Sequence, residues 1–431
     1  MPPEETTFRT VTDEGLERVL LVSVNLHGDP ALEADLAEMT RLVESAGGTV
    51  AAVASQSRHR PDPGTFVGSG KVEELAALAR SQDLGTMVFD HNLSPGQVGR
   101  LEKSTECKVI DRTELILAIF ALQARTPQAK LRIELAQLKY MLPRLSGMWH
   151  HLDRLGAGIG TRGPGETQLE VDRRRARTRI SALEARLAKV ESGSRTRRKL
   201  RSGMFSVALA GYTNAGKSTL LNRLCGSSVR SEDRLFATLD ATARRLELPG
   251  GETVVMSDTV GFIRNLPPML LDSFRSTLDA VTESDLILLV ADASDPERAT
   301  RVRTVTETLE RIGAGQIPRL LVWNKLDLPE ASVDGGIGVS ALRGTGMESL
   351  LMEIQARRRE ALDWRVLNMD ICPGDVENWI RKNAVTGSFH HSSDGGTTVT
   401  CGFFLGAQGA ARYLRSRGIS FTMKETDAVH R

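Results

Sequence analysis

The stretch from residue 211 to residue 218 constrains this chain more than any other, because it reads Gly-Tyr-Thr-Asn-Ala-Gly-Lys-Ser. An apolar run at 205–210 precedes it and a run of helical character at 219–224 follows, which predicts a strand, a glycine loop and a helix. The loop can turn its backbone N–H groups inward, Lys217 can meet the outer phosphates, and Ser218 offers a hydroxyl to Mg²⁺. The predicted nucleotide-phosphate site comprises Gly211, Tyr212, Thr213, Asn214, Ala215, Gly216, Lys217, Ser218 and Thr219.

Bulk properties narrow the class of protein. A length of 431 residues suggests roughly two to four domains. The four cysteines show no C-x-x-C spacing, which favours reduced thiols over a disulfide or zinc framework. The first residues are polar, and the longest apolar run, near 286–291, is far shorter than a membrane span. We therefore expect a cytoplasmic monomer without a membrane span.

The first 110 residues alternate short β-rich runs with amphipathic stretches. Strands are predicted at 19–24, 49–53 and 87–89, and helices at 31–46 and 71–81, which indicates a small α/β domain over residues 1–110. Within it, the segment 64–71 looks superficially like a second phosphate loop. Val72 follows its Gly-Lys pair where the Mg²⁺ ligand would be Ser or Thr, so we interpret the segment as a glycine turn before a helix.

A basic helical hairpin is predicted for residues 111–202. Leucines at helical spacing indicate two helices, or one helix kinked at Thr126-Pro127, before a glycine-rich stretch at 156–165. A heptad pattern from Glu166 onward predicts a helix that pairs antiparallel with the first. Between 166 and 201 there are twelve Lys or Arg and five Asp or Glu, an excess of seven positive charges.

The arginines of this hairpin favour an RNA partner. They lie close to the glycine loop, where guanidinium groups and bare backbone amides together suit phosphodiesters. A solvated charged face is the alternative, and it is the better interpretation for any one arginine; for the cluster we favour RNA. The residues concerned are Arg162, Arg173, Arg174, Arg175, Arg177 and Arg179.

A regular series of strands and helices predicts an α/β domain with a parallel sheet over residues 203–364. Buried strands are expected at 205–210, 253–257, 285–291 and 319–323, with helices on both faces of the sheet. The second strand leads into Asp258, Thr259, Val260 and Gly261. The Asp258 carboxylate can hold Mg²⁺ through water, and Gly261 allows a backbone N–H to approach the γ-phosphate.

Two further motifs select the base. Asn324, Lys325, Leu326 and Asp327 close the strand at 320–323. The Asp327 carboxylate can accept hydrogen bonds from the N1–H and 2-amino groups of guanine, which adenine lacks, so GTP is favoured over ATP. The Lys325 stem can cover the base and Asn324 can brace the phosphate loop. A backbone N–H for the guanine O6 is expected from Ser340, Ala341 or Leu342.

The polar segment at 236–240 lies between the phosphate loop and Asp258, where nucleotide-sensing loops occur. We expect Thr238 to close on Mg²⁺ and the γ-phosphate, with Thr242 as the alternative. The expected Mg²⁺ ligands are Ser218, Thr238 and Asp258, and the expected catalytic residues are Lys217, Thr238 and Gly261. The segment assigned to the nucleotide site is Phe236, Ala237, Thr238, Leu239 and Asp240.

The motif order is similar to that of translation-factor-class P-loop GTPases, and three strings resemble the HflX family: 236–240, 160–169 and 134–144. The second reads Gly-Thr-Arg-Gly-Pro-Gly-Glu-Thr-Gln-Leu and the third Glu-Leu-Ala-Gln-Leu-Lys-Tyr-Met-Leu-Pro-Arg. The resemblance covers residues 20–364. It implies a ribosome-associated GTPase that binds the large (50S) subunit, directs the hairpin loop toward the peptidyl-transferase region, and splits stalled or idle 70S particles.

The chain departs from many GTPases at Phe262, where a glutamine would orient the attacking water. We therefore expect slow intrinsic hydrolysis that a partner completes. Related phosphate loops use an asparagine at the position of Asn214 to hold K⁺, so K⁺ stimulation is a hypothesis; the alternative is that Asn214 only hydrogen-bonds the loop.

Other interpretations stay open from the sequence. One is an RNA-binding or RNA-remodelling protein, or a ribosome-assembly factor. Such a protein would use GTP only to set its affinity for RNA. An ATPase or small-molecule kinase would require that Asp327 not face a base. The tail at 365–431 predicts a small α+β domain, with helices at 376–381 and 410–417, a strand at 397–405 and no visible chemistry.

Overall fold

The computed structural model describes residues 17–26, 32–145, 164–199, 204–226, 235–236, 242–264, 267, 270, 275–393, 395–403 and 407–426. The chain divides into two compact units, which are treated separately below. The first unit contains Met1–Ser194 with two later segments, Ser231–Ala241 and Val260–Leu278; the second contains Arg195–Arg230, Thr242–Thr259 and Asp279–Arg431. In the described part of the chain, no helix combines the length and the apolar character needed to cross a membrane.

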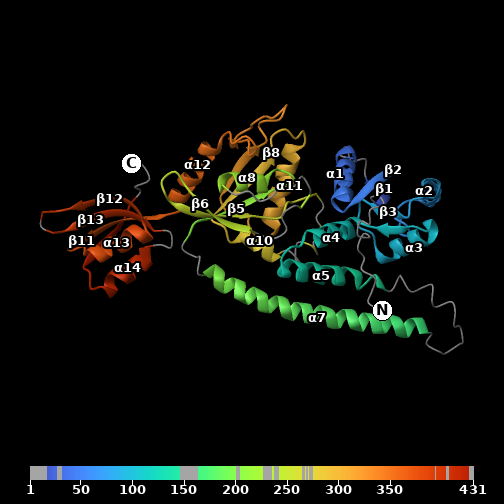
Figure 1. The fold of residues 1–431 in the computed structure, drawn as a ribbon, viewed down its shortest axis with the longest axis horizontal. Helices are drawn as coiled ribbons and strands as arrows, with labels where there is room; N and C mark the ends of the chain where they lie inside the picture. The colour runs from blue at the N-terminus through green and yellow to red at the C-terminus, as the bar shows by residue number, and fades with distance from the viewer. Residues whose placement is uncertain are drawn as a thin grey trace. The chain divides into compact units, whose positions relative to one another are not determined.

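The first unit begins with a four-stranded parallel sheet of order β2-β1-β3-β4 (Figure 1). Residues 19–24 of β1 are fully buried, as expected for a parallel strand covered on both faces. Its elements are β1 Glu17–Leu26, α1 Leu32–Ser45, β2 Gly48–Arg58, α2 Ser69–Gln82, β3 Thr86–Phe89, α3 Pro95–Thr105 and β4 Lys108–Ile110. The Gly-Lys segment at 64–71 is a turn that leads into α2, and Lys71 pairs with Glu74 at 2.6 Å.

Three helices follow in this unit: α4 Arg112–Gln123, α5 Pro127–Met141 and α7 Pro164–Lys199. Thr126 caps α5 through a 3.1 Å bond from Ala129 N, and Pro127 is its first residue, so the sequence break there separates two helices. Helix α7 runs alongside α5 in the opposite direction (Figure 1). Arg179 joins Glu134 at 2.6 Å and Lys139 joins Glu184 at 2.7 Å across the pair.

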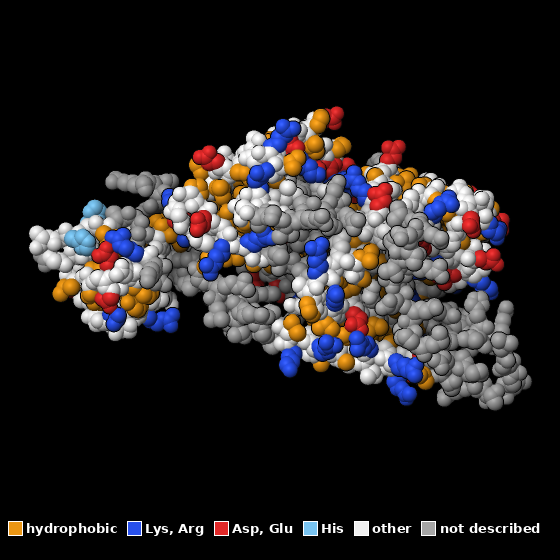
Figure 2. Space-filling model, viewed as in Figure 1, with side chains coloured by type: hydrophobic (Ala, Val, Ile, Leu, Met, Phe, Trp, Pro, Cys, Tyr) orange, Lys and Arg blue, Asp and Glu red, His pale blue; other side chains and the backbone are white. Residues whose placement is uncertain are grey.

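Helix α7 has a buried side and an exposed side among the residues whose side chains the structure describes. Leu183 and Leu187 are buried, whereas Arg174 and Arg177 are exposed. Figure 2 shows several Lys and Arg side chains along the side of the molecule where α7 runs. The glycine-rich stretch up to residue 163, including Arg162, lies outside the described residues.

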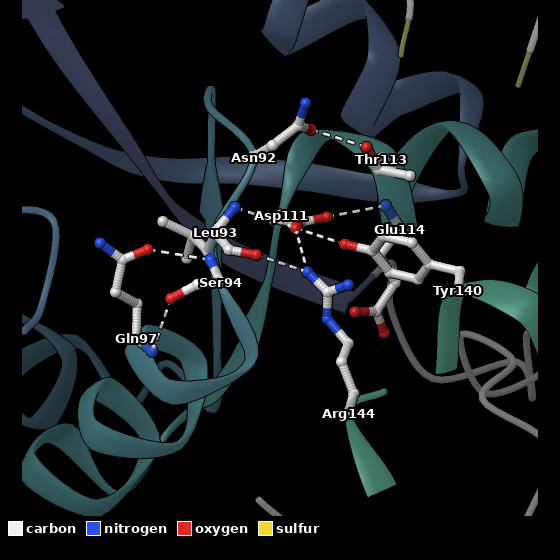
Figure 3. Close-up of polar contacts among 9 residues, drawn as sticks. All are labelled: Asn92, Leu93, Ser94, Gln97, Asp111, Thr113, Glu114, Tyr140 and Arg144. Carbon is white, nitrogen blue, oxygen red and sulfur yellow. Dashed lines mark hydrogen bonds and ion pairs between the residues drawn. The ribbon is translucent and has the colours of Figure 1, made fainter. Parts of the chain in front are cut away.

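A buried polar network fixes the end of α5 to the first sheet (Figure 3). The Asp111 carboxylate, which caps α4, accepts hydrogen bonds from the N–H of Leu93 at 3.1 Å and of Glu114 at 2.9 Å. It also accepts from the Tyr140 hydroxyl and from Arg144 at 2.7 Å. Arg144 donates to Leu93 O at 2.6 Å and lies 3.7 Å from the centre of the Tyr140 ring. The end of α5 that leads into the hairpin loop is therefore held by an ion pair shielded from water.

The second unit contains a six-stranded sheet of order β10-β9-β8-β5-β7-β6. The apolar strands β5 and β8 are central and almost wholly buried, as the sequence predicted. The edge strand β6 pairs antiparallel with β7, which the polar sequence at 242–247 did not indicate. The elements are β5 Ser206–Gly211, α8 Lys217–Leu224, β6 Thr242–Glu247, β7 Thr253–Asp258, α10 Arg275–Thr282, β8 Leu286–Asp292, α11 Arg298–Arg311, β9 Arg319–Asn324, β10 Ile337–Gly338 and α12 Met347–Glu360.

The tail forms a β-α-β-β-α-β domain with an antiparallel sheet of order β12-β13-β11-β14. Its two helices and one of its strands lie close to the predicted positions, and three further strands complete the sheet. Leu367, Val399 and Leu414 are fully buried in its core. Its elements are β11 Asp363–Met369, α13 Gly374–Asn383, β12 Val385–His391, β13 Thr397–Phe403, α14 Ala407–Ser416 and β14 Phe421–Glu425.

Candidate functional site

The sheet order of the second unit brings the sequence motifs to one edge. Strands β9, β8, β5 and β7 are neighbours and parallel, so their carboxyl ends meet. Asn324, Asp292, Gly211 and Asp258 are the last residues of these strands, in that order. Ligands in sheets of this kind bind at this edge, so the phosphate and base motifs lie where one ligand could contact both.

Two glycines of the phosphate loop are required by close backbone approach. A Cβ on Gly211 would lie 2.2 Å from the carbonyl oxygen of Val290. Gly216 has φ +85°, and a Cβ there would lie 2.3 Å from Asn324 Nδ2. Helix α8 starts directly after it, at Lys217, so the loop presents a helix N-terminus as expected for a phosphate site.

Lys217 is buried at the start of α8, and backbone carbonyls hold its ammonium group. Nζ donates to Gly211 O at 3.1 Å and to Tyr212 O at 2.8 Å. Burial lowers the pKa of Lys217 to about 8, although the nearby Asp258 carboxylate acts in the opposite direction. The lysine is thus held in the loop at a place where a phosphate would restore its full charge.

The donor set for a hard cation is present beside the loop. Ser218 Oγ donates to Asp258 Oδ2 at 2.6 Å, and Asp258 Oδ1 accepts from Thr259 N at 2.9 Å. A hydroxyl and a carboxylate next to a phosphate cradle suit Mg²⁺, which prefers one or two protein oxygens together with phosphate oxygens. Thr213 Oγ1 is buried and has no hydrogen-bond partner in the described part of the chain, as in a loop built around a ligand.

The base motifs form a connected network. Asn324 Nδ2 donates to Ala215 O at 2.9 Å, and Asn324 Oδ1 accepts from Ala341 N at 3.0 Å. The Ser340 hydroxyl donates to the Asp327 carboxylate. Asn324 therefore joins the phosphate loop to the 340–342 loop, and Asp327 is held in a fixed orientation.

Three contacts around these motifs were not predicted from the sequence. Lys325 Nζ pairs with Asp292 at 2.7 Å, which orients the lysine from the neighbouring strand. Burial alone would raise the pKa of Asp292, but hydrogen bonds from Lys325 and Ser294 outweigh it and lower the pKa. Arg301 of α11 lies 5.0 Å from the centre of the Tyr212 ring. Arg223 of α8 contacts the 340–342 loop, as detailed below.

A signal in the sequence existed for one of these residues. Asp292 ends a predicted buried strand, and polar residues at strand ends were the criterion that found the other motifs. Arg223 and Arg301 lie within helices, where an arginine is ordinary and no pattern distinguishes it.

The segments that the sequence predicts to sense the nucleotide belong to the first unit and are partly described. Phe236 is buried, with its ring centre 4.7 Å from that of Phe120 in α4, so its side chain serves a hydrophobic contact. Val260, Gly261 and Phe262 are also buried. The expected positions of Ala237, Thr238, Leu239 and Asp240 lie outside the described residues.

Three family models match consecutive parts of the chain. Residues 33–121 match a model described as GTP-binding GTPase N-terminal, residues 123–201 its Middle Region, and residues 206–325 a model described as 50S ribosome-binding GTPase.

Curated relatives match over most of their length. The GTPase HflX of Alkalihalophilus pseudofirmus is 47% identical over 323 residues, which cover 74% of this chain and 76% of that protein. The GTPase HflX of Escherichia coli is 43% identical over 353 residues, with 79% and 83% covered. A solved structure of a GTP-binding protein from Sulfolobus solfataricus in complex with GDP aligns with a TM-score of 0.42 and 24% identity, covering 79% of this chain and 98% of that one.

Proposed function

Because this chain belongs to the HflX family of GTPases, we propose that it binds the large ribosomal subunit and dissociates stalled or idle 70S ribosomes in a GTP-dependent cycle. Its reaction is the hydrolysis of GTP, given the family and the matched GTPase domain. The description of that domain model as a 50S ribosome-binding GTPase supports the partner. The edge of the second sheet, where Lys217, Asp258 and Asp327 converge, is the observation that carries the nucleotide part of the proposal.

At the phosphate end, Lys217 contacts the β- and γ-phosphates and the backbone N–H of Gly261 approaches the γ-phosphate. Mg²⁺ would be held by Ser218 and Asp258, with Thr238 joining in the GTP state, and would neutralise charge on the phosphate oxygens. The 2.6 Å contact between Ser218 and Asp258 supports this assignment. From the sequence motifs, we also assign the remaining phosphate-loop residues and the 236–240 segment to nucleotide binding.

At the base end, Asp327 accepts from the N1–H and 2-amino groups of guanine and the stem of Lys325 covers the base. The ion pair of Lys325 with Asp292 and the hydroxyl of Ser340 on Asp327 support these roles. Leu326 continues the motif, and its N–H donates to Val339 O at 3.1 Å.

Intrinsic hydrolysis is slow in this proposal, because Phe262 is buried and apolar where a polar side chain would orient water. The ribosome supplies the missing positioning. K⁺ beside Asn214 would add positive charge near the phosphates, and the positive φ of Asn214, 61°, and the unpartnered Thr213 hydroxyl within the described chain support a ligand there.

Ribosomal RNA is contacted through the exposed arginines of α7 and the loop before it. Arg174 and Arg177 are exposed on the same helix as the buried Leu183 and Leu187, so one face of α7 packs while the other is available. Guanidinium groups bind phosphodiesters strongly, which supports this face of α7 as the RNA interface. Arg179 is already paired with Glu134, so it contributes less.

The organisation proposed for the chain follows the sequence boundaries. It comprises an N-terminal α/β domain at 1–110, the basic hairpin at 111–202, the GTP-binding domain at 203–364 and the small tail domain at 365–431. We further propose a cytoplasmic monomer.

The test is sedimentation of 70S ribosomes with the full chain and GTP, a non-hydrolysable GTP analogue, or GDP. We expect free subunits to accumulate with GTP and with the analogue, and less with GDP. The Lys217→Ala chain should lose both GTP binding and splitting. Unchanged 70S particles in every arm would contradict the splitting role, and splitting by the variant without GTP binding would favour an RNA-remodelling function.

A further inference from the structure

The loop at residues 340–344 offers one backbone N–H to a ligand. Within the described chain, Leu342 is the member of this loop whose N–H has no acceptor, and its side chain is 68% exposed. The other four amides are occupied by the protein: Ser340 N by Thr345 O at 3.0 Å, Ala341 N by Asn324 Oδ1 at 3.0 Å, Arg343 N by Ser340 Oγ at 3.1 Å and Gly344 N by Ser340 O at 2.7 Å.

The Leu342 N–H belongs to the same loop as Ser340, which contacts Asp327, the carboxylate proposed to accept from the N1–H of guanine. Ser340 donates its hydroxyl to Asp327, so the loop and the carboxylate form one rigid piece. Guanine carries O6 beside N1–H, so a guanine that donates its N1–H to the Asp327 carboxylate directs its O6 toward a neighbouring donor. The Leu342 N–H is the donor that the loop leaves for it.

Arg223 holds the peptide group that contains this N–H. Its Nε donates to Ala341 O at 2.9 Å, and its Nη2 donates to Leu342 O. The Ala341 carbonyl and the Leu342 N–H belong to one planar trans peptide and point in opposite directions. A guanidinium that fixes the carbonyl therefore fixes the direction of the N–H, and its charge polarises the amide and strengthens the hydrogen bond that it donates.

We propose that Arg223 is a positioning residue for guanine recognition, which directs the Leu342 N–H onto O6 of the base. Arg223 lies on α8, the helix that begins with Lys217, so the same helix binds the phosphates and sets the donor for the base. This inference rests on the guanine site proposed above. It differs from a purely structural role, because its effect depends on the atom at position 6 of the base.

The experiment measures the affinity of the full chain for three probes: GDP, IDP, which keeps O6 but lacks the 2-amino group, and 6-thio-GDP, in which a weakly accepting sulfur replaces O6. We expect Arg223→Ala to weaken GDP and IDP by about five- to twentyfold, the value of one hydrogen bond strengthened by charge. The loss with 6-thio-GDP should stay below about twofold. The GDP affinity of Arg223→Lys, which keeps a hydrogen-bond donor, should lie between that of Arg223→Ala and that of the wild type.

A matched control is Arg311→Ala at the exposed end of α11, which should change no affinity. The ratio of the affinities for two probes does not depend on the fraction of the variant that is folded. A loss of stability would therefore not change this ratio. An equal loss for all three probes, or no loss for GDP, would overturn the role of Arg223. A wild-type chain that binds ADP as tightly as GDP would instead refute the guanine site itself.

Discussion

Two titratable residues, Lys217 and Glu114, owe their properties to burial and to one or two fixed neighbours. Lys217 is almost inaccessible to water and is solvated by two carbonyl groups, so its charge is less stable than on a free lysine. Glu114 is half-buried beside the ion pair of Asp111 with Arg144. Both residues should therefore titrate at unusual pH values.

Nucleotide binding should take up protons at Lys217. The free site has a pKa of about 8, and a bound phosphate raises it, so binding at pH 8 should take up about half a proton and binding at pH 7 about a tenth. Affinity should fall as pH rises above 8, because the charged lysine is the form that binds. Titration calorimetry with GDP in buffers of different ionisation enthalpy gives the uptake; equal values at pH 7 and pH 8 would contradict the assignment.

The free energy of unfolding of the first unit should depend on Glu114. Burial, and then the neighbouring Asp111 carboxylate, raise the pKa of Glu114 to about 7. A carboxyl group whose pKa is raised in the folded state contributes most to the free energy of unfolding below pH 4.5. This contribution is lost as the pH rises through 7. Glu114→Gln should thus stabilise the unit by about 1–2 kcal/mol at pH 8 and much less at pH 5.

Hydrogen exchange of α4 amides at the two pH values measures this difference. The control is Glu73→Gln on the exposed face of α2. A stabilisation that is the same at pH 5 and pH 8 would contradict the raised pKa of Glu114.

At the scale of elements, α4 joins the first sheet to the segment that precedes β6. Its N-terminus is capped by Asp111, and near its other end Phe120 meets Phe236 while Gln123 Nε2 donates to Leu235 O at 2.8 Å. Ser45 Oγ accepts from Leu235 N at 3.2 Å. The described part of the nucleotide-sensing segment is therefore packed into the unit that carries the basic helix.

The aromatic contact should be worth a measurable coupling energy. The Phe120 and Phe236 rings meet edge to face at 68°, and both are buried. Phe120→Ala and Phe236→Ala should each destabilise the first unit by about 3 kcal/mol, with the double variant less destabilised than the sum by about 1 kcal/mol. Hydrogen exchange of the α4 amides measures the stability of the two single variants and of the double variant. Additive effects in the double variant would contradict the coupling.

At the scale of the whole molecule, the chain passes between the units on both sides of the β6–β7 pair. The phosphate loop and Asp258 belong to the second unit, whereas the segments around 236 and 261 belong to the first. The groups proposed to bind the nucleotide and those expected to respond to its γ-phosphate thus have different packing partners. A change of nucleotide can therefore alter contacts in the unit that bears α7.

Binding of the large subunit should depend on salt through the arginines of α7. Arg174→Ala with Arg177→Ala removes two exposed guanidinium groups, so the slope of log affinity against log salt should become shallower by about 1.5. Arg412→Ala with Arg415→Ala on α14 is the control of equal charge. Binding assays at several salt concentrations test this, and an equal change in both double variants would point to a general charge effect.

The sequence alone determined the features that depend on neighbouring residues. The strand, glycine loop and helix around 206–224, the motif at 324–327 and the heptad face of α7 are local patterns, and the structure has the predicted elements at these places. The three family-model matches confirm the resemblance to the HflX family that sequence motifs indicated.

Only the tertiary structure decided the features that depend on residues far apart in the chain. The antiparallel β6, the Asp111 network, the contact of Phe120 with Phe236, and the bonds of Asp292 and Arg223 each join segments whose proximity the fold sets. The physical reason is that a pattern fixes which face of an element is apolar, whereas the partner on that face depends on topology. The lowered pKa of Lys217 belongs to the same class, because burial is a property of the folded chain.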